Sequence, residues 1–264
     1  MVVAAIRAGH NDDFTDFNLG ILSRRFAMVM NRLGVRQVDG LCNVLASGDD
    51  VFYNRFLAEL IPPTTELFRD PSFWKFLKEE VLPLLLRQFG ELRVLQAACG
   101  SGEELYSLLI LLHLLKIREQ VEVTCTYCCE QNLSQIRGGG MPVRRRELDE
   151  NNFHVIEAQG EYEQFVSSEN ESPVFRQEFL EGVRFFRQTP EFNLQKEGTF
   201  HLILCRNQFL YFNPQLGIRN MEVLFRSLVV GGVLALGTKE HLESYQNGST
   251  FTVLNGDESL YRRK

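Results

Sequence analysis

Apolar residues recur at helical spacing through the first sixty residues of the chain. Ile21, Phe26, Val29 and Leu33 follow one such pattern, and strand signals are scarce there. The same spacing continues further along, at Leu41, Val44, Leu45, Phe52, Phe56 and Leu57. Two consecutive prolines, at positions 62 and 63, then interrupt the pattern. We therefore predict a small helical domain over residues 1–60.

A different pattern begins after the prolines. We expect a further helix over residues 71–88, bent by Pro83, and beyond it short apolar runs alternate with helical segments. The strands are expected at residues 93–98, 121–126, 183–187, 200–205 and 233–237. Such alternation is typical of a parallel sheet that carries helices on both faces. An α/β fold is therefore predicted for residues 61–264.

Two segments depart from this alternation. Near the end of the sequence, residues 251–254 and 260–262 flank the turn Asn255-Gly256-Asp257, which predicts an antiparallel hairpin. Residues 141–182 are polar and weakly periodic, and they are too many for a plain connection. We interpret this second stretch as an inserted subdomain.

Composition and charge narrow the range of partners. The 264 residues are 44% hydrophobic and 23% charged, which is ordinary for a globular protein. A net charge of −6 argues against a general nucleic-acid binder, because phosphate contacts need a basic surface. The most apolar run, residues 105–115, is too short to span a bilayer, and residues 1–12 contain no long apolar stretch. We expect a cytoplasmic protein without membrane insertion.

Three of the six cysteines are crowded together, at Cys125, Cys128 and Cys129. A structural zinc site would need a second pair of ligands at similar spacing, and none follows. The Cys-x-x-Cys pair also ends an expected strand, whereas redox pairs open a helix. We favour ordinary buried thiols and expect no metal.

A glycine turn, Gly100-Ser101-Gly102, separates an expected strand from an expected helix, and this is a common ligand cradle. Glu103 and Glu104 follow at once, where they would repel the phosphates of a nucleotide. A ligand that carries an ammonium group and no phosphate suits the turn better, and S-adenosyl-L-methionine is such a ligand. From the residues alone, Glu103 either contacts this ligand or only complements the helix dipole.

Four segments together resemble the chemotaxis receptor glutamate methyltransferases, the CheR family. They are residues 64–70 (Thr-Thr-Glu-Leu-Phe-Arg-Asp), 97–107 with the glycine turn, 205–212 (Cys-Arg-Asn-Gln-Phe-Leu-Tyr-Phe) and 237–240 (Gly-Thr-Lys-Glu). The resemblance implies a class I methyltransferase fold, which is a Rossmann-like sheet with a C-terminal antiparallel hairpin. It also implies a preceding helical domain and an inserted subdomain, in the positions that the hydrophobic pattern predicts.

The resemblance also assigns roles to individual residues. It implies that Arg69 and Tyr211 lie nearest the reacting methyl group, as the catalytic residues. The cofactor-binding positions that it implies, taken with the glycines of the turn, are Thr65, Arg69, Ala97, Gly100, Gly102, Glu103, Arg206 and Asn207. Without the resemblance, Arg69 reads as a surface ion pair with Asp70 or Glu66, and Tyr211 as a packed aromatic.

The sequence departs from the family pattern around the expected adenosine pocket. Tyr127 stands where the family has the acid that holds the ribose hydroxyls, and Glu130 is a candidate replacement from the next helix. Thr189-Pro190 replaces the family's Asn-Leu, and Leu105 replaces a proline. We expect Tyr127, Glu130 and Thr189 at this pocket, and weaker cofactor binding, because a tyrosine hydroxyl offers less to a diol than a carboxylate does.

The resemblance implies transfer of a methyl group from S-adenosyl-L-methionine to protein glutamates, with S-adenosylhomocysteine as the product. Glutamate is ionised at neutral pH, so this reaction needs little acid–base help. The partner implied is an acidic helical receptor domain, which would face Arg25, Arg32 and Arg36 on one helix face. A catalytically weak signalling module and a small-molecule methyltransferase remain as alternatives.

Overall fold

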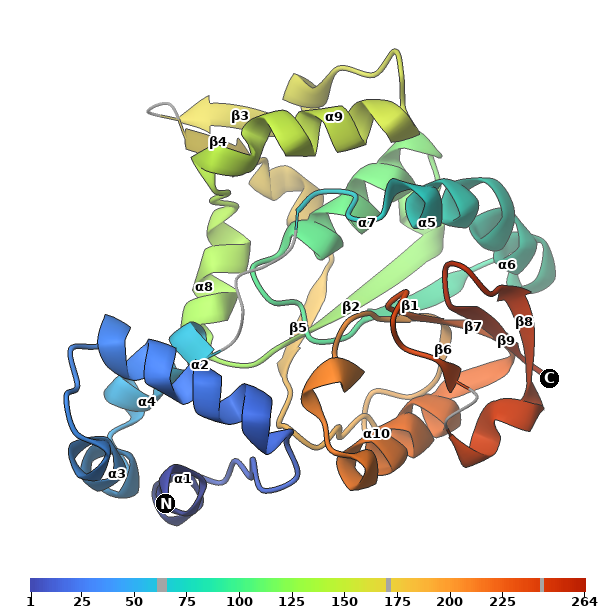
Figure 1. Cartoon of the computed structure of the whole chain (residues 1–264). Helices are drawn as coiled ribbons and strands as arrows, with labels where there is room; N and C mark the ends of the chain where they lie inside the picture. Colours follow the sequence, from blue (N-terminus) through green and yellow to red (C-terminus); the bar gives the residue numbers. More distant parts are fainter. Residues whose placement is uncertain (61–65, 170–171, 243–244) are drawn as a thin grey trace.

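A computed structural model describes residues 1–60, 66–169, 172–242 and 245–264. The chain begins with four helices, drawn in blue in Figure 1, that pack around a small core of their own. Ile6, Leu41 and Phe56 are fully buried in it. The helices are α1 (Val2–Gly9), α2 (Leu19–Arg32), α3 (Val38–Ala46) and α4 (Asp50–Leu60).

A seven-stranded sheet forms the centre of the molecule (Figure 1), in the order β5-β2-β1-β6-β7-β9-β8. The first five strands in this order are parallel, whereas β9 runs antiparallel to both β7 and β8. The predicted fold class is confirmed, because this is the class I methyltransferase sheet with its closing hairpin. The strands are β1 (Leu92–Gln96), β2 (Val121–Tyr127), β5 (Arg184–Arg187), β6 (Phe200–Cys205), β7 (Leu228–Leu236), β8 (Phe251–Asn255) and β9 (Leu260–Arg263).

Helices cover both faces of the sheet. α7 (Glu103–Leu114) lies in the larger core cluster, whereas α10 (Pro214–Ser227) packs with the other one. The expected helix at 71–88 is three pieces: α5 (Pro71–Phe76), a π-helical turn (Leu77–Val81) and α6 (Leu82–Phe89). Pro83 lacks an N–H group, so a break in the regular ladder before it is the expected response.

The inserted stretch is built into the main core. It contains α9 (Arg146–Ile156) and a short antiparallel pair, β3 (Val166–Glu169) and β4 (Ser172–Phe175). Phe153, Phe165 and Phe175 are buried with the apolar residues of α7, and the Phe175 ring stacks on Tyr106 at 4.2 Å. α7 is therefore covered on several sides, which explains why residues 105–112 are all buried.

The segment that leads into α2 is fastened to the loop after β6. The amide of Asn18 donates to the Tyr211 carbonyl at 2.8 Å, and the amide of Asn213 donates to the Asp16 carbonyl at 2.9 Å. Arg219 of α10 also pairs with the Asp16 carboxylate at 2.5 Å. These bonds hold the N-terminal helices against the carboxyl ends of the parallel strands, where ligands bind in sheets of this type.

Candidate active site

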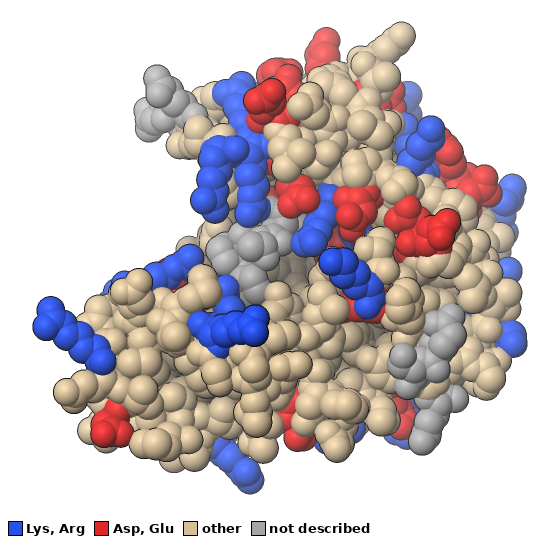
Figure 2. Space-filling view, viewed as in Figure 1, with Lys and Arg blue, Asp and Glu red and all other residues tan. Residues whose placement is uncertain are grey.

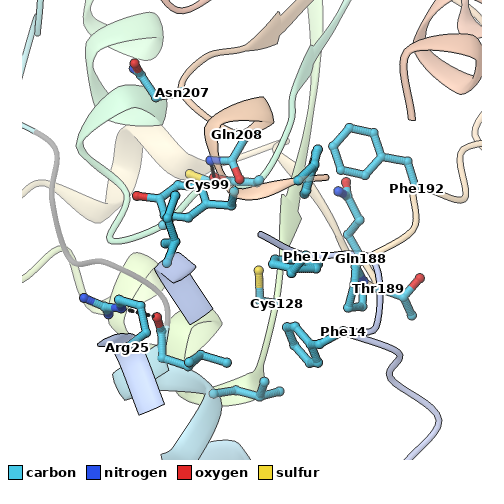
Figure 3. A pocket seen from close by; sticks show the side chains of 18 of the residues that line it. Phe14, Phe17, Arg25, Cys99, Cys128, Gln188, Thr189, Phe192, Asn207 and Gln208 are labelled. Atoms are coloured by element: carbon cyan, nitrogen blue, oxygen red, sulfur yellow. Dashed lines mark hydrogen bonds between the residues drawn. The ribbon is translucent and has the colours of Figure 1, made fainter. Parts of the chain in front are cut away.

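A cavity lies between the N-terminal helices and the carboxyl ends of the strands. The loops that follow β1, β5 and β6 line one side of it, and Phe14, Phe17 and residues of α2 and α4 line the other. Figure 3 shows Cys99, Cys128, Gln188 and Gln208 from the sheet side, with Phe14 and Phe17 beside them. The cavity thus combines an apolar wall with a polar floor, as small-molecule sites commonly do.

The glycine turn is shaped so that its backbone faces the cavity. Ala98, with φ of 53°, donates its amide to the Thr126 hydroxyl at 2.6 Å. Gly102 has φ of 111°, and a Cβ there would lie 2.6 Å from the Tyr106 ring. Gly100 and Gly102 line the cavity, as expected, whereas Ala97 is buried behind Ala98. The turn therefore offers bare backbone to a ligand, and a side chain at position 102 would not fit.

The two glutamates of the first turn of α7 have different surroundings. Glu104 lines the cavity and accepts hydrogen bonds from Gln96 at 2.9 Å and from Arg206 at 3.0 Å. Glu103 is only 1% exposed, is absent from the cavity lining and is hydrogen-bonded to the Ser101 hydroxyl. Burial raises the pKa of Glu103. Glu104 is therefore the acid in the cavity lining, whereas Glu103, which was expected to contact the ligand, lies outside that lining.

Arg206 directly follows β6, and its buried side chain contacts two other segments of the chain. Its guanidinium pairs with Asp70 at 2.5 Å and with Glu104 at 3.0 Å, and it lies 4.0 Å from the centroid of the Phe73 ring. It also contacts the Arg69 carbonyl at 3.4 Å. Arg206 lines the cavity as expected, and its hydrogen bonds fix the position of Glu104 and of the Arg69 segment.

Asn207 lines the cavity in a left-handed conformation, with φ of 58°. Glu240 holds its loop, because the Glu240 carboxylate accepts from the amides of Asn207 at 2.8 Å, Phe209 at 2.7 Å and Gly237 at 2.6 Å. A Cβ on Gly237 would lie 2.6 Å from the Asn207 side-chain oxygen. The segment at 237–240 thus acts by shaping the loop that carries Asn207.

Arg69 and Tyr211 both line the cavity, as expected, and Arg25 of α2 joins them. Burial raises the pKa of Tyr211, while the positive charges of Arg25 and Arg69 oppose that rise. Arg25 is held by the carbonyls of Leu60 and Glu59, each at 2.8 Å; the first of these bonds is dashed in Figure 3. Thr65 lies outside the described residues.

Of the three residues expected at the adenosine pocket, Tyr127 and Glu130 are absent from the cavity lining and Thr189 is part of it. The Tyr127 hydroxyl donates to Glu130 at 3.0 Å, and neither side chain lines the cavity. Glu130 is exposed, next to Asn54 of α4. Thr189 does line the cavity, together with Gln188 and Cys128 at the ends of β5 and β2. The end of the cavity nearest β2 and β5 is therefore formed without the side chain of Tyr127.

Several residues that line the cavity carry no sequence motif from which their position could be predicted. Asp12, Phe14 and Phe17 precede the first predicted strand by more than seventy residues, and no motif marks them. Gln188 and Gln208 stand next to motif positions and carry no distinguishing pattern. The sequence shows that Glu104 follows Glu103, but only the geometry of the helix start shows which of the two lines the cavity.

No helix in the ranges that the structure describes is long and apolar enough to cross a membrane. Within the same ranges, no group of His, Cys, Asp and Glu side chains is placed to hold a metal ion.

The sequence of this chain is also similar to those of known proteins. Residues 63–259 match the family model described as CheR methyltransferase, SAM binding domain. A Pseudomonas putida protein named as a methyltransferase, Cher3, is 24% identical over 266 residues, which cover 100% of this chain and 95% of the relative. The chemotaxis protein methyltransferase of Listeria monocytogenes is 29% identical over 196 residues, covering 74% of this chain and 71% of the relative.

The solved structures that resemble this chain are more distant. The N-methyltransferase NodS from Bradyrhizobium japonicum, in complex with S-adenosyl-L-homocysteine, is 11% identical with a TM-score of 0.40. The match covers 74% of this chain and 90% of NodS.

Proposed function

Because this chain belongs to the CheR methyltransferase family, whose matching domain binds S-adenosyl-L-methionine, we propose that it methylates glutamate side chains of a protein. The cofactor supplies an electrophilic methyl group that is bound to a sulfonium sulfur. When the methyl group is transferred, this sulfur becomes a neutral thioether. The residues of the cavity fit this cofactor. Bare backbone at Gly100 and Gly102 admits it, Glu104 suits its ammonium group, and the apolar wall suits its adenosine.

The observation that carries the proposal is that Arg25, Arg69 and Tyr211 all line this one cavity. Two cations in the lining of a cavity attract an anionic acceptor, and Arg presents a planar fork that matches a carboxylate. The described residues that line the cavity include no His or Lys to act as a base for an amine or alcohol. A carboxylate needs none, because it is already ionised and the transfer releases no proton.

Within this proposal, each group has a simple task. Arg69 orients the acceptor carboxylate, and Tyr211 borders the methyl site through its hydroxyl. Phe14 and Phe17 keep water away from the reacting oxygen. Arg206 holds Glu104 and the Arg69 segment in place through its hydrogen bonds, so it acts as a positioning residue.

The surface around the site supports an acidic protein as the substrate. Figure 2 shows Lys and Arg side chains on both sides of the hollow between the N-terminal helices and the region of α8 (Glu130–Gly138) and α9. Arg24 and Arg36 are exposed, whereas Arg32 pairs with Glu59 at 2.7 Å and Arg25 bonds to carbonyls of α4. An acidic helical segment of a receptor fits such a basic border.

A methyl-transfer assay with a base-hydrolysis step tests the proposal. The protein is incubated with methyl-labelled S-adenosyl-L-methionine and acidic helical receptor fragments, and the product is then treated with alkali. A glutamate methyl ester releases volatile labelled methanol, and matched fragments with glutamine in place of glutamate should release none. The Arg69→Ala variant should transfer at least about tenfold more slowly, with less effect on S-adenosylhomocysteine binding.

The other outcomes identify the alternatives. Label that resists alkali, or that passes to small molecules, would contradict glutamate as the acceptor. Cofactor binding without transfer to any fragment would instead favour a signalling module.

A further inference from the structure

The ribose of the cofactor needs a hydrogen-bond acceptor that the end of β2 does not supply. In dinucleotide and related sheets, an acidic side chain near this strand end accepts from the ribose hydroxyls. Here the strand ends at Tyr127, whose hydroxyl is engaged with Glu130 and whose side chain does not line the cavity. Another residue must therefore meet the ribose if the cofactor binds in the usual place.

Asp12 is a carboxylate at that place, although it comes from the other end of the chain. It lines the cavity and is 3% exposed. One of its oxygens, Oδ2, accepts from the Tyr53 hydroxyl at 2.7 Å and from Arg187. The other oxygen, Oδ1, has no hydrogen-bond partner among the residues that the structure describes.

The position of Asp12 is fixed by the two strands that border the adenosine end. Arg187, the last residue of β5, bonds to the Asp12 carboxylate. The same guanidinium donates from Nε to the carbonyl of Cys128 at 3.1 Å, directly after β2. Cys128 and Gln188, neighbours of these contacts, line the cavity too. Asp12 is thus attached to the ends of β2 and β5, where a ribose lies in this type of sheet.

We propose that Asp12 accepts hydrogen bonds from the ribose hydroxyls of S-adenosyl-L-methionine, in place of the acid missing at Tyr127. A buried carboxylate with one unpaired oxygen is unfavourable, and a ligand hydroxyl would satisfy it. The donors on Oδ2 keep the side chain from rotating away. The inference rests on cofactor binding by this cavity, and it does not depend on glutamate being the methyl acceptor.

The competing explanation is that Asp12 only holds Tyr53 and Arg187 together. The two roles differ in what they predict for a ligand without ribose hydroxyls. A residue that contacts the diol discriminates between S-adenosylhomocysteine and its 2′,3′-dideoxy analogue, whereas a structural residue affects both ligands alike.

Calorimetric titration of the full chain with these two ligands tests the proposal. Asp12→Asn should weaken S-adenosylhomocysteine about 10- to 100-fold and leave the dideoxy analogue within about twofold of wild type. The matched control is Asp13→Asn, because Asp13 is exposed and bonds locally to Thr15, and it should bind both ligands as wild type does.

A second variant covers the event that Asp12→Asn does not fold. Asp12→Glu keeps the negative charge for Arg187 and displaces the oxygens by one methylene, so it should reduce the preference for the hydroxylated ligand. Equal weakening of both ligands, or unchanged binding of S-adenosylhomocysteine by the variants, would overturn the proposal. Since only binding is measured, failure here is distinct from failure to methylate glutamate.

Discussion

At the residue scale, the site depends on charges that are held away from water. Arg206 is nearly fully buried, and it joins Asp70, Glu104 and the Arg69 carbonyl, which come from two separate segments. Removing one member of such a group leaves the others buried without a partner, and this costs more than the group contributes as a whole. Arg206 therefore positions both Glu104 and the segment that carries Arg69.

A second buried acid, Asp149 of α9, makes the free energy of unfolding depend on pH. It is fully buried and accepts the Leu67 amide at 2.8 Å, while its Oδ2 has no partner among the described residues. Burial raises its pKa from 3.8 to about 7, with Glu103 adding to the rise. The charges of Arg145 and Glu66 and the phenol of Tyr162 lie in the same surroundings.

The sign of the effect follows from linkage. The folded state keeps the Asp149 proton up to about pH 7, whereas the unfolded chain loses it near pH 4. The stability that this group contributes is therefore present at low pH and is lost as the pH rises through 7. We expect Asp149→Asn to reduce the fall in unfolding free energy between pH 5 and 8 by on the order of 3 kcal/mol.

Urea unfolding at the two pH values measures this difference. Asp13→Asn is a suitable control, because hydrogen bonds from Thr15 lower the pKa of Asp13, so its titration lies below this range. An Asp149→Asn variant that retains the full wild-type pH dependence would contradict the assignment.

The acids Glu103, Glu104 and Asp149 also show which properties of single residues the sequence does not predict. The expectation of a ligand with an ammonium group and no phosphate followed from charge, because the two glutamates after the glycine turn repel phosphates. Which glutamate faces the ligand depends on a rotation of about 100° between neighbours on a helix, and no sequence pattern fixes that rotation when both are acids. Asp149 lies in the weakly periodic insertion, where no motif distinguished it from exposed acids.

At the scale of elements, the loop after β6 is shaped by the loop after β7. The Glu240 carboxylate accepts short hydrogen bonds from the backbone amides of Asn207, Phe209 and Gly237. Gly237 is needed because a Cβ there would lie 2.8 Å from the Asn207 amide nitrogen. The two loops therefore have to move together, and the Asn207 side of the cavity moves with them.

Gly237→Ala tests this coupling. The added methyl group should displace the Asn207 loop and weaken S-adenosylhomocysteine binding by roughly tenfold or more, with a stability loss of about 1–3 kcal/mol from overpacking. Calorimetry and urea unfolding measure the two effects. Gly138→Ala in α8 is the matched control, because nothing lies within 4 Å of its added Cβ, and it should bind ligand normally. Wild-type affinity in Gly237→Ala would show that the loops are independent.

The elements themselves were largely predictable from the sequence. The central parallel strands β1, β6 and β7 are largely buried, so each contains a short apolar run, whereas the edge strand β5 has no buried residue. The bend at Pro83 was also visible, since proline interrupts a helix for a local reason. The insertion was harder, because Phe153, Phe165 and Phe175 join the core through long-range packing on α7. Their spacing alone does not separate a core contact from a surface aromatic.

At the scale of the whole molecule, the N-terminal helices and the sheet share the cavity. Residues of α2, of α4 and of the segment between α1 and α2 form one wall, and the loops after β1, β5 and β6 form the other. The two parts meet through the Asn18–Tyr211 and Asn213–Asp16 backbone bonds and the Asp16–Arg219 ion pair. A cofactor in this cavity touches both parts, so its binding energy should oppose their separation.

Hydrogen exchange with and without S-adenosylhomocysteine measures this closure. If the parts separate transiently and the separated form does not bind ligand, a ligand concentration of about 100 times Kd should slow exchange through that opening by about 100-fold. The amides of Asn18 and Asn213 cross the boundary and should show the effect. Helix α3, which contributes nothing to the cavity lining, serves as the internal reference and should change little. Equal slowing in α3 and at the boundary would mean that the ligand suppresses only global unfolding. Protection confined to the boundary would show that the N-terminal helices close over the cofactor as a unit, which the proposed contact of Asp12 with the ribose also implies.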